Sequence, residues 1–254
     1  MKNIYKNSSL NLARAKKILM KNNIIGLPTE TVYGLAGNAY SNNAVKKIYK
    51  LKKRPRINPL IIHYYNLRLL KKDAFLSERF LKLYKKFSPG PLTYILKKRK
   101  NSKISSFANA NLKTIAVRFP QNRIIRNLLG NLKFPLAIPS ANLSSAVSPV
   151  CSNDVLDEFG KKLSFILDGG KCKIGLESTV VNLNKKTQIL RPGAISAKEI
   201  GKILRKKVYF SNKSNKVISP GMTKKHYSPG IPIELNCKKM DDKAACIVFG
   251  KRYK

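Results

Sequence analysis

The sequence contains little that acid–base, metal or disulfide chemistry could use. Its 254 residues include no tryptophan, two histidines, four cysteines and only 12 acidic residues. So few carboxylates argue against a glycosidase-like acid–base pair and against an acidic two-metal cage. The cysteines have no C-x-x-C spacing and lie far from the histidines, which argues against a zinc site or a disulfide framework. We therefore expect reduced, cytosolic cysteines and no metal-binding residues.

Signatures of membrane insertion and of standard nucleotide-binding loops are also missing. The longest uncharged stretch, residues 134–153, contains three prolines and several serines and asparagines, so it is unsuited to a membrane span. The N-terminus lacks the apolar run of a signal peptide. Neither G-x-x-x-x-G-K-[ST] nor G-x-G-x-x-G occurs, and no G-x-S-x-G elbow supports a serine hydrolase. The sequence predicts a cytoplasmic protein without a membrane partner, in which side chains would hold any phosphate.

Positive charge is abundant. The 52 Lys and Arg residues against 12 Asp and Glu give a formal charge of +40, which favours polyanionic partners such as nucleotides or RNA, or an acidic membrane surface. The many Lys, Asn and Ile residues are also what a drift in genome base composition would produce. Any single lysine can therefore equally be ordinary solvated surface.

Strand-like and helix-like segments alternate, which is typical of an α/β sheet with flanking helices. Helical spacing or capping residues predict helices over 10–21, 41–52, 77–87, 152–160 and 196–206, the last opened by the capping-box pair Ser196 and Glu199. Extended segments are expected at 24–27, 60–64, 92–97, 114–119, 136–138, 163–167, 179–183 and 188–190. Residues from 208 onward are rich in Ser, Asn, Pro and Gly and indicate a linker.

Polar clusters next to the expected strands are the candidate binding groups. They read PTETVYGL (28–35), PSANLS (139–144), EST (177–179) and LRPG (190–193), and ligands of open α/β sheets bind at strand ends. The segment LKKRPRINPL (51–60) places cations before a strand, which suits phosphate binding. Ordinary turns and a helix end whose cations complement the dipole explain the same residues.

At these residues the sequence resembles the threonylcarbamoyl-AMP synthase family and its YrdC-like domain. The resemblance covers roughly residues 8–230 through PTETVYGL, K-x-R-P-x-x-N-P-L (52–60), TIAVRFP (114–120), PSANLS, ESTVV and LRPG. The later SPGMTKKHYSP (219–229) resembles the linker of the longer, two-domain branch. The resemblance implies a twisted, open, mixed sheet flanked by helices, with a catalytic domain at 1–206, a linker over the site at 207–230 and a short remnant of a C-terminal α/β domain at 231–254.

The activity implied is the conversion of L-threonine, bicarbonate and ATP to threonylcarbamoyl-AMP and pyrophosphate. A partner complex would transfer the threonylcarbamoyl group to tRNA. The carbamate oxygen would attack the α-phosphorus without a covalent enzyme intermediate, so no catalytic residue is assigned, and Mg²⁺ would arrive with ATP. The implied threonine set is Thr31, His63, Arg118, Ser140 and Ser178; the implied ATP set is Lys52, Arg54, Asn58, Thr114, Asn142, Val150, Arg191 and Tyr227.

Three details qualify this assignment. Val150 stands where the family usually has threonine, so only its backbone could contact nucleotide. Tyr227, with Lys224 and His226, corresponds to linker residues that fold over the site and would form a lid that excludes water. His63 is assigned to threonine by the resemblance alone, because a histidine near a strand end is often only structural.

Other functions remain open at this stage. A basic RNA-binding module without adenylate synthesis would account for the charge, although no aromatic RNA-reading motif accompanies it. Weak RNA binding could also accompany the enzyme. Carbamoyl transfer during metal-centre maturation uses a related domain in far longer chains, and an inactive family member is a further alternative.

Overall fold

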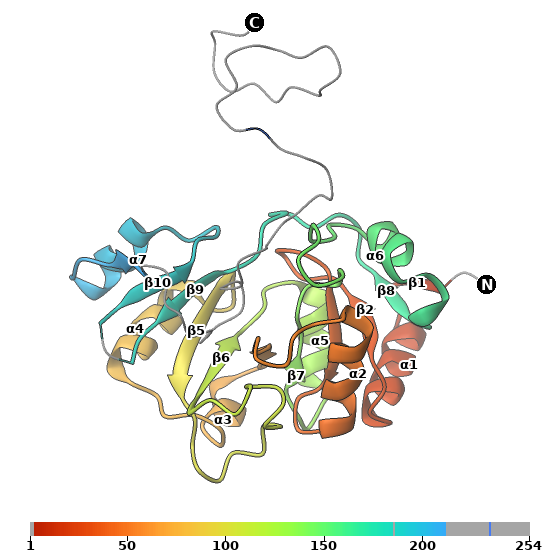
Figure 1. The fold of residues 1–254 in the computed structure, drawn as a ribbon, viewed down its shortest axis with the longest axis horizontal. Helices are drawn as coiled ribbons and strands as arrows, with labels where there is room; N and C mark the ends of the chain where they lie inside the picture. The colour runs from red at the N-terminus through yellow and green to blue at the C-terminus, as the bar shows by residue number, and fades with distance from the viewer. Residues whose placement is uncertain (1–2, 185, 212–233, 235–254) are drawn as a thin grey trace, which may run out of the picture.

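The computed structural model describes residues 3–184, 186–211 and 234, and within them the chain forms one open, mixed sheet flanked by helices (Figure 1). The strand order is β1-β8-β2-β3-β7-β4-β6-β5-β9-β10-β11, with both parallel and antiparallel neighbours. The strands are β1 (Ile4–Lys6), β2 (Ile25–Leu27), β3 (Gly34–Asn38), β4 (Ile61–His63), β5 (Leu92–Lys97), β6 (Thr114–Arg118), β7 (Leu136–Ala137), β8 (Ile166–Asp168), β9 (Thr179–Asn182), β10 (Gln188–Arg191) and β11 (Tyr209–Phe210). The predicted fold class is confirmed.

The five predicted helices are present with capping groups at their first turns. The helices are α1 (Ser9–Met20), α2 (Asn42–Lys52), α3 (Leu67–Leu70), α4 (Glu78–Phe87), α5 (Arg123–Gly130), α6 (Ser152–Phe159) and α7 (Ala197–Leu204), and a 3₁₀ turn spans Gly160–Lys162. Ser196 and Glu199 form the predicted capping box: the serine hydroxyl accepts from the Glu199 N–H, and the Glu199 carboxylate accepts from the Ser196 N–H. None of the helices in the described ranges is long and apolar enough to cross a bilayer.

All eight predicted extended segments contain strands, with ends shifted by up to three residues. Three further strands (β1, β3 and β11) and two helices (α3 and α5) were not predicted. The largest difference is β3: residues 28–35 were interpreted as a polar cluster or an ordinary turn after a strand, yet a strand begins at Gly34. Its sequence, GLAGN, is poor in the β-branched and aromatic residues that mark strands.

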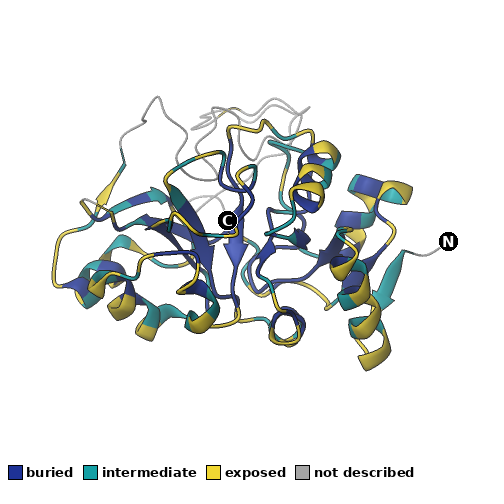
Figure 2. Cartoon of the chain, turned by 90° about the horizontal axis from the view of Figure 1, so that it is seen from below, coloured by how far each residue is buried: buried dark blue, intermediate teal, exposed yellow. Residues whose placement is uncertain are grey.

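Apolar clusters lie on both faces of the sheet, as the dark blue strands between yellow-edged helices in Figure 2 indicate. Consecutive side chains of a strand point to opposite faces. In β3, Leu35 packs in a cluster with α6 residues, whereas Ala36 packs in a cluster with α1 and α5 residues. A larger cluster joins α2, α4 and α7 to the strands at the centre of the sheet. Helices on both sides therefore fix the positions of the strand ends.

Several of these strand ends converge on one region. The segments after β2 and β7 meet there because Gly34 approaches the Ile138–Pro139 backbone closely; a Cβ on Gly34 would lie 2.3 Å from Ile138 Cγ2 and 2.9 Å from the Pro139 carbonyl oxygen. His63 ends β4 and Arg118 ends β6, and these two residues are register partners in neighbouring parallel strands. The linker and remnant predicted at 207–230 and 231–254 lie, apart from residues 207–211 and 234, outside the described residues.

Candidate functional site

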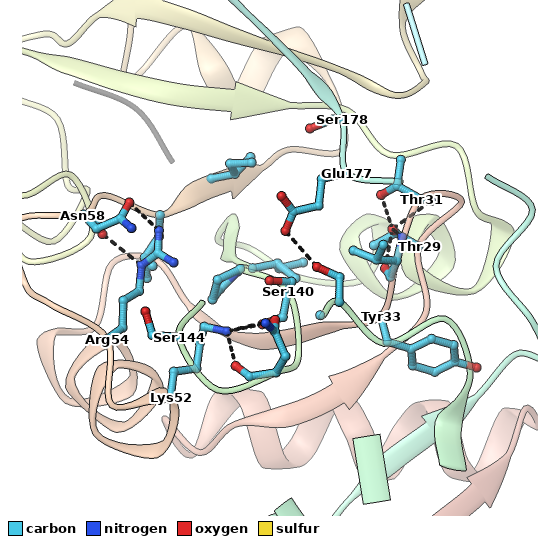
Figure 3. Close-up of a pocket in the computed structure, with 18 of the residues that line it drawn as sticks. Thr29, Thr31, Tyr33, Lys52, Arg54, Asn58, Ser140, Ser144, Glu177 and Ser178 are labelled. Carbon is cyan, nitrogen blue, oxygen red and sulfur yellow. Dashed lines mark hydrogen bonds between the residues drawn. The ribbon is translucent and has the colours of Figure 1, made fainter. Parts of the chain in front are cut away.

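The converging strand ends and loops line a cavity (Figure 3). Ten of the thirteen predicted site residues line it: Thr31, Lys52, Arg54, Asn58, His63, Arg118, Ser140, Asn142, Ser178 and Arg191. Lys52, Arg54 and Asn58 lie at one end and Thr31 at the other, with Ser140 and Glu177 between them. Residues from both predicted sets thus share one cavity.

At the Thr31 end of the cavity, Arg118 and Glu30 form a buried ion pair. Arg118 Nη2 lies 2.7 Å from Glu30 Oε1 and also donates to Thr31 Oγ1 at 2.9 Å. Arg118 and Glu30 are 4% and 6% exposed. Burial alone would raise the pKa of Glu30, but the Arg118 charge and hydrogen bond, with the Gln121 N–H, outweigh it and lower that pKa. The Arg118 Nε–H has no hydrogen-bond partner among the described residues.

His63 lies beside this pair and is almost fully buried. Burial and the Arg118 charge lower the pKa of His63 to about 3, so its ring is neutral at pH 7. Its Nδ1 is 3.3 Å from the Ile61 carbonyl oxygen, which requires the proton on Nδ1 and leaves Nε2 as an acceptor. Nε2 has no partner in the described part of the chain. It can therefore accept a hydrogen bond from a polar ligand.

The neutral state of His63 predicts a pH dependence of stability. A folded pKa of about 3 against 6.5 in the unfolded chain means that the unfolded state binds more protons. The stability that the neutral His63 contributes is therefore fully present above pH 6.5 and is lost as the pH falls toward 3. Urea unfolding measured at pH 6.5 and at pH 4.5 tests this. Between the two pH values, the free energy of unfolding of wild type should fall by on the order of 2 kcal/mol more than that of His63→Gln, which lacks the titrating ring. Equal losses would contradict the assignment of a neutral, buried His63.

Lys52 connects the helix α2 to the PSAN segment. Its Nζ donates to the backbone carbonyl oxygens of Ser140 and Asn142, and its own carbonyl oxygen accepts from the Ser144 N–H at 2.9 Å. The side chain is 1% exposed. Burial, followed by the charge of Arg54, lowers the pKa of Lys52 to about 7. An anionic ligand in the cavity would favour the charged form of this lysine.

Arg54 is held by the Asn58–Pro59 turn. Its Nε donates to the Asn58 carbonyl oxygen at 3.0 Å, and its Nη2 donates to Asn58 Oδ1 at 2.6 Å and to the Pro59 carbonyl oxygen at 2.9 Å. Burial lowers the pKa of Arg54 to about 10, which leaves the guanidinium charged at neutral pH. The turn orients Arg54 without neutralising it, because all three acceptors are uncharged.

Arg191, at the end of β10, forms a second buried ion pair. Its Nη1 lies 2.6 Å from Glu177 Oε2, and its Nε and Nη2 donate to the Ser178 carbonyl oxygen at 3.1 and 2.9 Å. Nη2 also lies 3.2 Å from Ser178 Oγ, which hydrogen-bonds Thr93 Oγ1 at 2.7 Å. Ser148 donates to the other Glu177 oxygen. Arg191 thereby fixes the EST segment at the cavity wall.

Two predicted site residues, Thr114 and Val150, do not line the cavity, and a third is not among the described residues. Thr114 begins β6, four residues before Arg118, so it is separated from Arg118 by roughly 13 Å of strand. Val150 does not line the cavity, and its backbone groups are engaged: its N–H donates to Asp154 at 2.7 Å and its carbonyl oxygen accepts from the Cys172 N–H at 2.8 Å. The backbone contact of Val150 with nucleotide stays a prediction. Tyr227 lies outside the described residues.

Sequence reasoning missed two carboxylates as functional groups: Glu177, which lines the cavity, and Glu30, which pairs with the lining residue Arg118. Glu30 and Glu177 lie within the PTETVYGL and EST segments, but their partners are 88 and 14 residues away. The only signal was their position next to Thr31 and Ser178. Tyr33, Thr29 and Ser148 also line the cavity and were not assigned.

The charge of the cavity lining suits an anionic ligand. Four basic side chains and one carboxylate, that of Glu177, line it, which is an excess of three formal positive charges. In the described ranges, no three His, Cys, Asp or Glu residues are grouped so that they could hold a metal ion. Glu30 and Glu177 are each paired with an arginine.

A family model named Sua5/YciO/YrdC and described as telomere recombination matches residues 17–193. The chain belongs to this family. A second model, described as the C-terminal domain of threonylcarbamoyl-AMP synthase, matches residues 195–252. Among the curated Sua5/YciO/YrdC proteins, the threonylcarbamoyl-AMP synthase of Pyrococcus abyssi is 37% identical over 86% of this chain and 66% of its own length. That of Schizosaccharomyces pombe is 42% identical over 81% of this chain and 58% of its own length.

Solved structures of the Sua5/YciO/YrdC family agree with this membership. The crystal structure of Pyrococcus abyssi Sua5 in complex with L-threonine superposes with a TM-score of 0.83 at 35% identity, covering 89% of this chain and 68% of the other. The chain spans 58 to 66% of the length of the first curated relatives that it matches.

Proposed function

We propose that the chain joins L-threonine, bicarbonate and ATP to give threonylcarbamoyl-AMP, pyrophosphate and water. The observation that carries this proposal is the one cavity in which Thr31 lies at one end and Lys52 and Arg54 at the other (Figure 3). Arg118 bonds Thr31, and His63 is the register partner of Arg118. The relatives named threonylcarbamoyl-AMP synthase support it. Threonine amine and bicarbonate would form a carbamate with loss of water. A carbamate oxygen would then attack the α-phosphorus, and the bond to pyrophosphate would break.

Threonine would bind at the end formed by Arg118. The unpaired Arg118 Nε–H can donate to the threonine carboxylate, and His63 Nε2 can accept from the threonine hydroxyl or ammonium group. Thr31, Ser140 and Ser178 would orient the remaining polar atoms. A site whose buried donors and acceptors match those of the substrate rejects analogues that lack a hydroxyl.

ATP would bind at the end formed by Arg54 and Lys52, with Asn58, Asn142 and Arg191 nearby. Phosphoryl-type transfer depends mainly on position and on positive charge near the phosphate oxygens. The guanidinium of Arg54 is already oriented by Asn58, so little reorganisation is needed when phosphate arrives. Magnesium would enter bound to ATP and supply further positive charge there.

The product would serve a partner. A threonylcarbamoyl-adenylate is a mixed anhydride, so a transferase complex that modifies tRNA would take up its threonylcarbamoyl group. The reaction would take place in the cytoplasm.

The proposal is tested by following pyrophosphate release from ATP with threonine and bicarbonate, each omitted in turn. We expect dependence on both, and a loss of about 100-fold in kcat/KM for ATP in Arg54→Ala, because a preorganised phosphate donor is removed. Arg56→Ala is the matched control, since Arg56 is on the same turn but exposed. Release that does not require threonine, or that Arg54→Ala leaves unchanged, would disprove the synthase. Salt-sensitive RNA binding without pyrophosphate release would favour the RNA-binding module instead.

A further inference from the structure

The turn that ends the PSAN segment contains a strained serine. Leu143 and Ala146 close this turn, because the Ala146 N–H donates to the Leu143 carbonyl oxygen at 3.2 Å. Ser145, the third residue of the turn, has a φ of +78°, whereas the φ of Ser144 before it is not positive. These angles match a type II turn, whose third position favours glycine because a Cβ there is crowded by the backbone. The turn therefore holds a serine at a conformational cost.

Neighbouring groups keep the turn in this conformation. The Asn142 side-chain amide donates to the Leu143 carbonyl oxygen at 2.8 Å and to the Ala146 carbonyl oxygen at 2.7 Å, so it ties the two ends of the turn together. The Ser144 N–H donates to the Lys52 carbonyl oxygen. A strained residue persists where its surroundings determine its conformation, and such residues cluster at ligand-binding and catalytic sites. The strain in this turn therefore calls for a functional explanation.

Ser145 lines the cavity, and its two donor groups are available to a ligand. The residue is half-buried, and neither its hydroxyl nor its N–H has a hydrogen-bond partner among the described residues. The turn lies at the nucleotide end of the cavity, because Ser144 is beside Lys52 and Arg54 in Figure 3. Two neutral donors near two cationic side chains suit a phosphate group, which accepts several hydrogen bonds at once.

We propose that Ser145 is a further ATP-binding residue, whose hydroxyl and N–H donate to a phosphate group of the nucleotide. This inference rests on the proposed synthase function for the identity of the nucleotide. Glycine would relax the turn but would present the N–H alone, so the serine hydroxyl adds a ligand contact in exchange for the strain. Asn142 then acts as a positioning residue for Ser145, because both hydrogens of its amide are engaged by the turn.

The test measures binding of magnesium–ATP to the full chain by titration calorimetry, together with the KM values for ATP and threonine in pyrophosphate release. Ser145→Ala removes the hydroxyl but keeps the Cβ that strains the turn. It should weaken ATP binding by roughly ten- to a hundredfold, as expected for the loss of a hydrogen bond to a charged group. The KM for threonine and the melting temperature should stay close to the wild-type values. General loosening of the PSAN segment would instead raise the KM for threonine as well, because Ser140 lies on that segment.

Ser145→Gly removes the hydroxyl and the strain together. Its melting temperature should rise by about 1–4 °C, because relief of the left-handed backbone outweighs the greater freedom of glycine in the unfolded chain. Its ATP affinity should fall as in Ser145→Ala. Ala110→Gly is the matched control, since Ala110 has a φ of +51° and does not line the cavity. It should raise the melting temperature in the same way and leave ATP affinity unchanged.

The inference and the proposed function can fail separately. Suppose that wild type binds ATP and the Ser145 variants bind it more weakly, but pyrophosphate release does not require threonine. The synthase would then be disproved, and Ser145 would remain a nucleotide-binding residue. Wild-type ATP affinity in Ser145→Ala, an equal rise in both KM values, or a wild type that does not bind ATP would each overturn the inference. A melting temperature that Ser145→Gly leaves unchanged would do so as well, because the turn would then not be strained.

Discussion

Arg118→Ala is expected to lower kcat/KM for threonine by about a thousandfold while leaving the KM for ATP within a few-fold of wild type. Arg118 is the only basic residue that contacts Thr31 among the hydrogen bonds of the described ranges, and its free Nε–H is placed for a carboxylate. Loss of a preorganised charged donor in a buried site costs a factor of 10² to 10³, at the upper end when the donor is a full charge. Pyrophosphate release at varied threonine and saturating ATP measures the effect.

The same substitution leaves the Glu30 carboxylate buried without its counter-ion, which should destabilise the fold by about 3–5 kcal/mol. The double variant Glu30→Gln/Arg118→Ala separates the two effects, because it removes the unpaired charge and should recover most of the stability but none of the threonine affinity. Arg126→Ala is the control, since Arg126 lies over the Tyr65 ring and outside the cavity. If activity returned together with stability, Arg118 would be structural rather than a threonine-binding residue.

The sequence predicts site residues that lie within a recognisable motif. It does not predict contacts between residues that are distant in the sequence and meet only in the folded chain. Arg54 and Asn58 are four residues apart, so one turn explains both their motif and their contact. Glu30 and Arg118 are 88 residues apart and meet only because the loop after β2 lies beside the end of β6. A local sequence pattern cannot predict a contact between residues so far apart in the chain. The scarcity of acidic residues also drew attention away from the two carboxylates, although each of them fixes an arginine.

The contacts of Lys52 are a second example of what the sequence does not predict. The position of Lys52 before Arg54 predicts a phosphate ligand, and this stays a prediction, but the sequence gives no sign that its ammonium group also lies between the carbonyl oxygens of Ser140 and Asn142. That contact depends on the approach of the α2 end to the PSAN segment. In the fold, strands with apolar runs such as 92–97 were found from the sequence, whereas β3 was missed because its burial comes from neighbours on both faces rather than from its own residue types.

Arg191→Ala is expected to produce the converse of the Arg118 result: a loss of about a thousandfold in kcat/KM for ATP, with a smaller change for threonine. Arg191 lies near Arg54, whose pKa its charge helps to lower, so the two guanidinium groups together form the positive end of the cavity. The smaller threonine effect follows from the contact of Arg191 with Ser178. Pyrophosphate release at varied ATP and saturating threonine gives the first value, and the reverse titration gives the second.

Two further variants show whether charge or position is responsible. Arg191→Lys keeps a positive charge but cannot bond the Ser178 carbonyl through two nitrogens as Arg191 does, so it should recover only part of the ATP affinity. Glu177→Gln/Arg191→Ala removes the carboxylate as well as the arginine and should restore stability without restoring ATP affinity. Arg99→Ala, an arginine outside the cavity, should have no effect on either KM. A rise in the KM for threonine as large as that for ATP would show that the cavity does not divide into two ends, because Arg191 would then act through Ser178 on the amino acid.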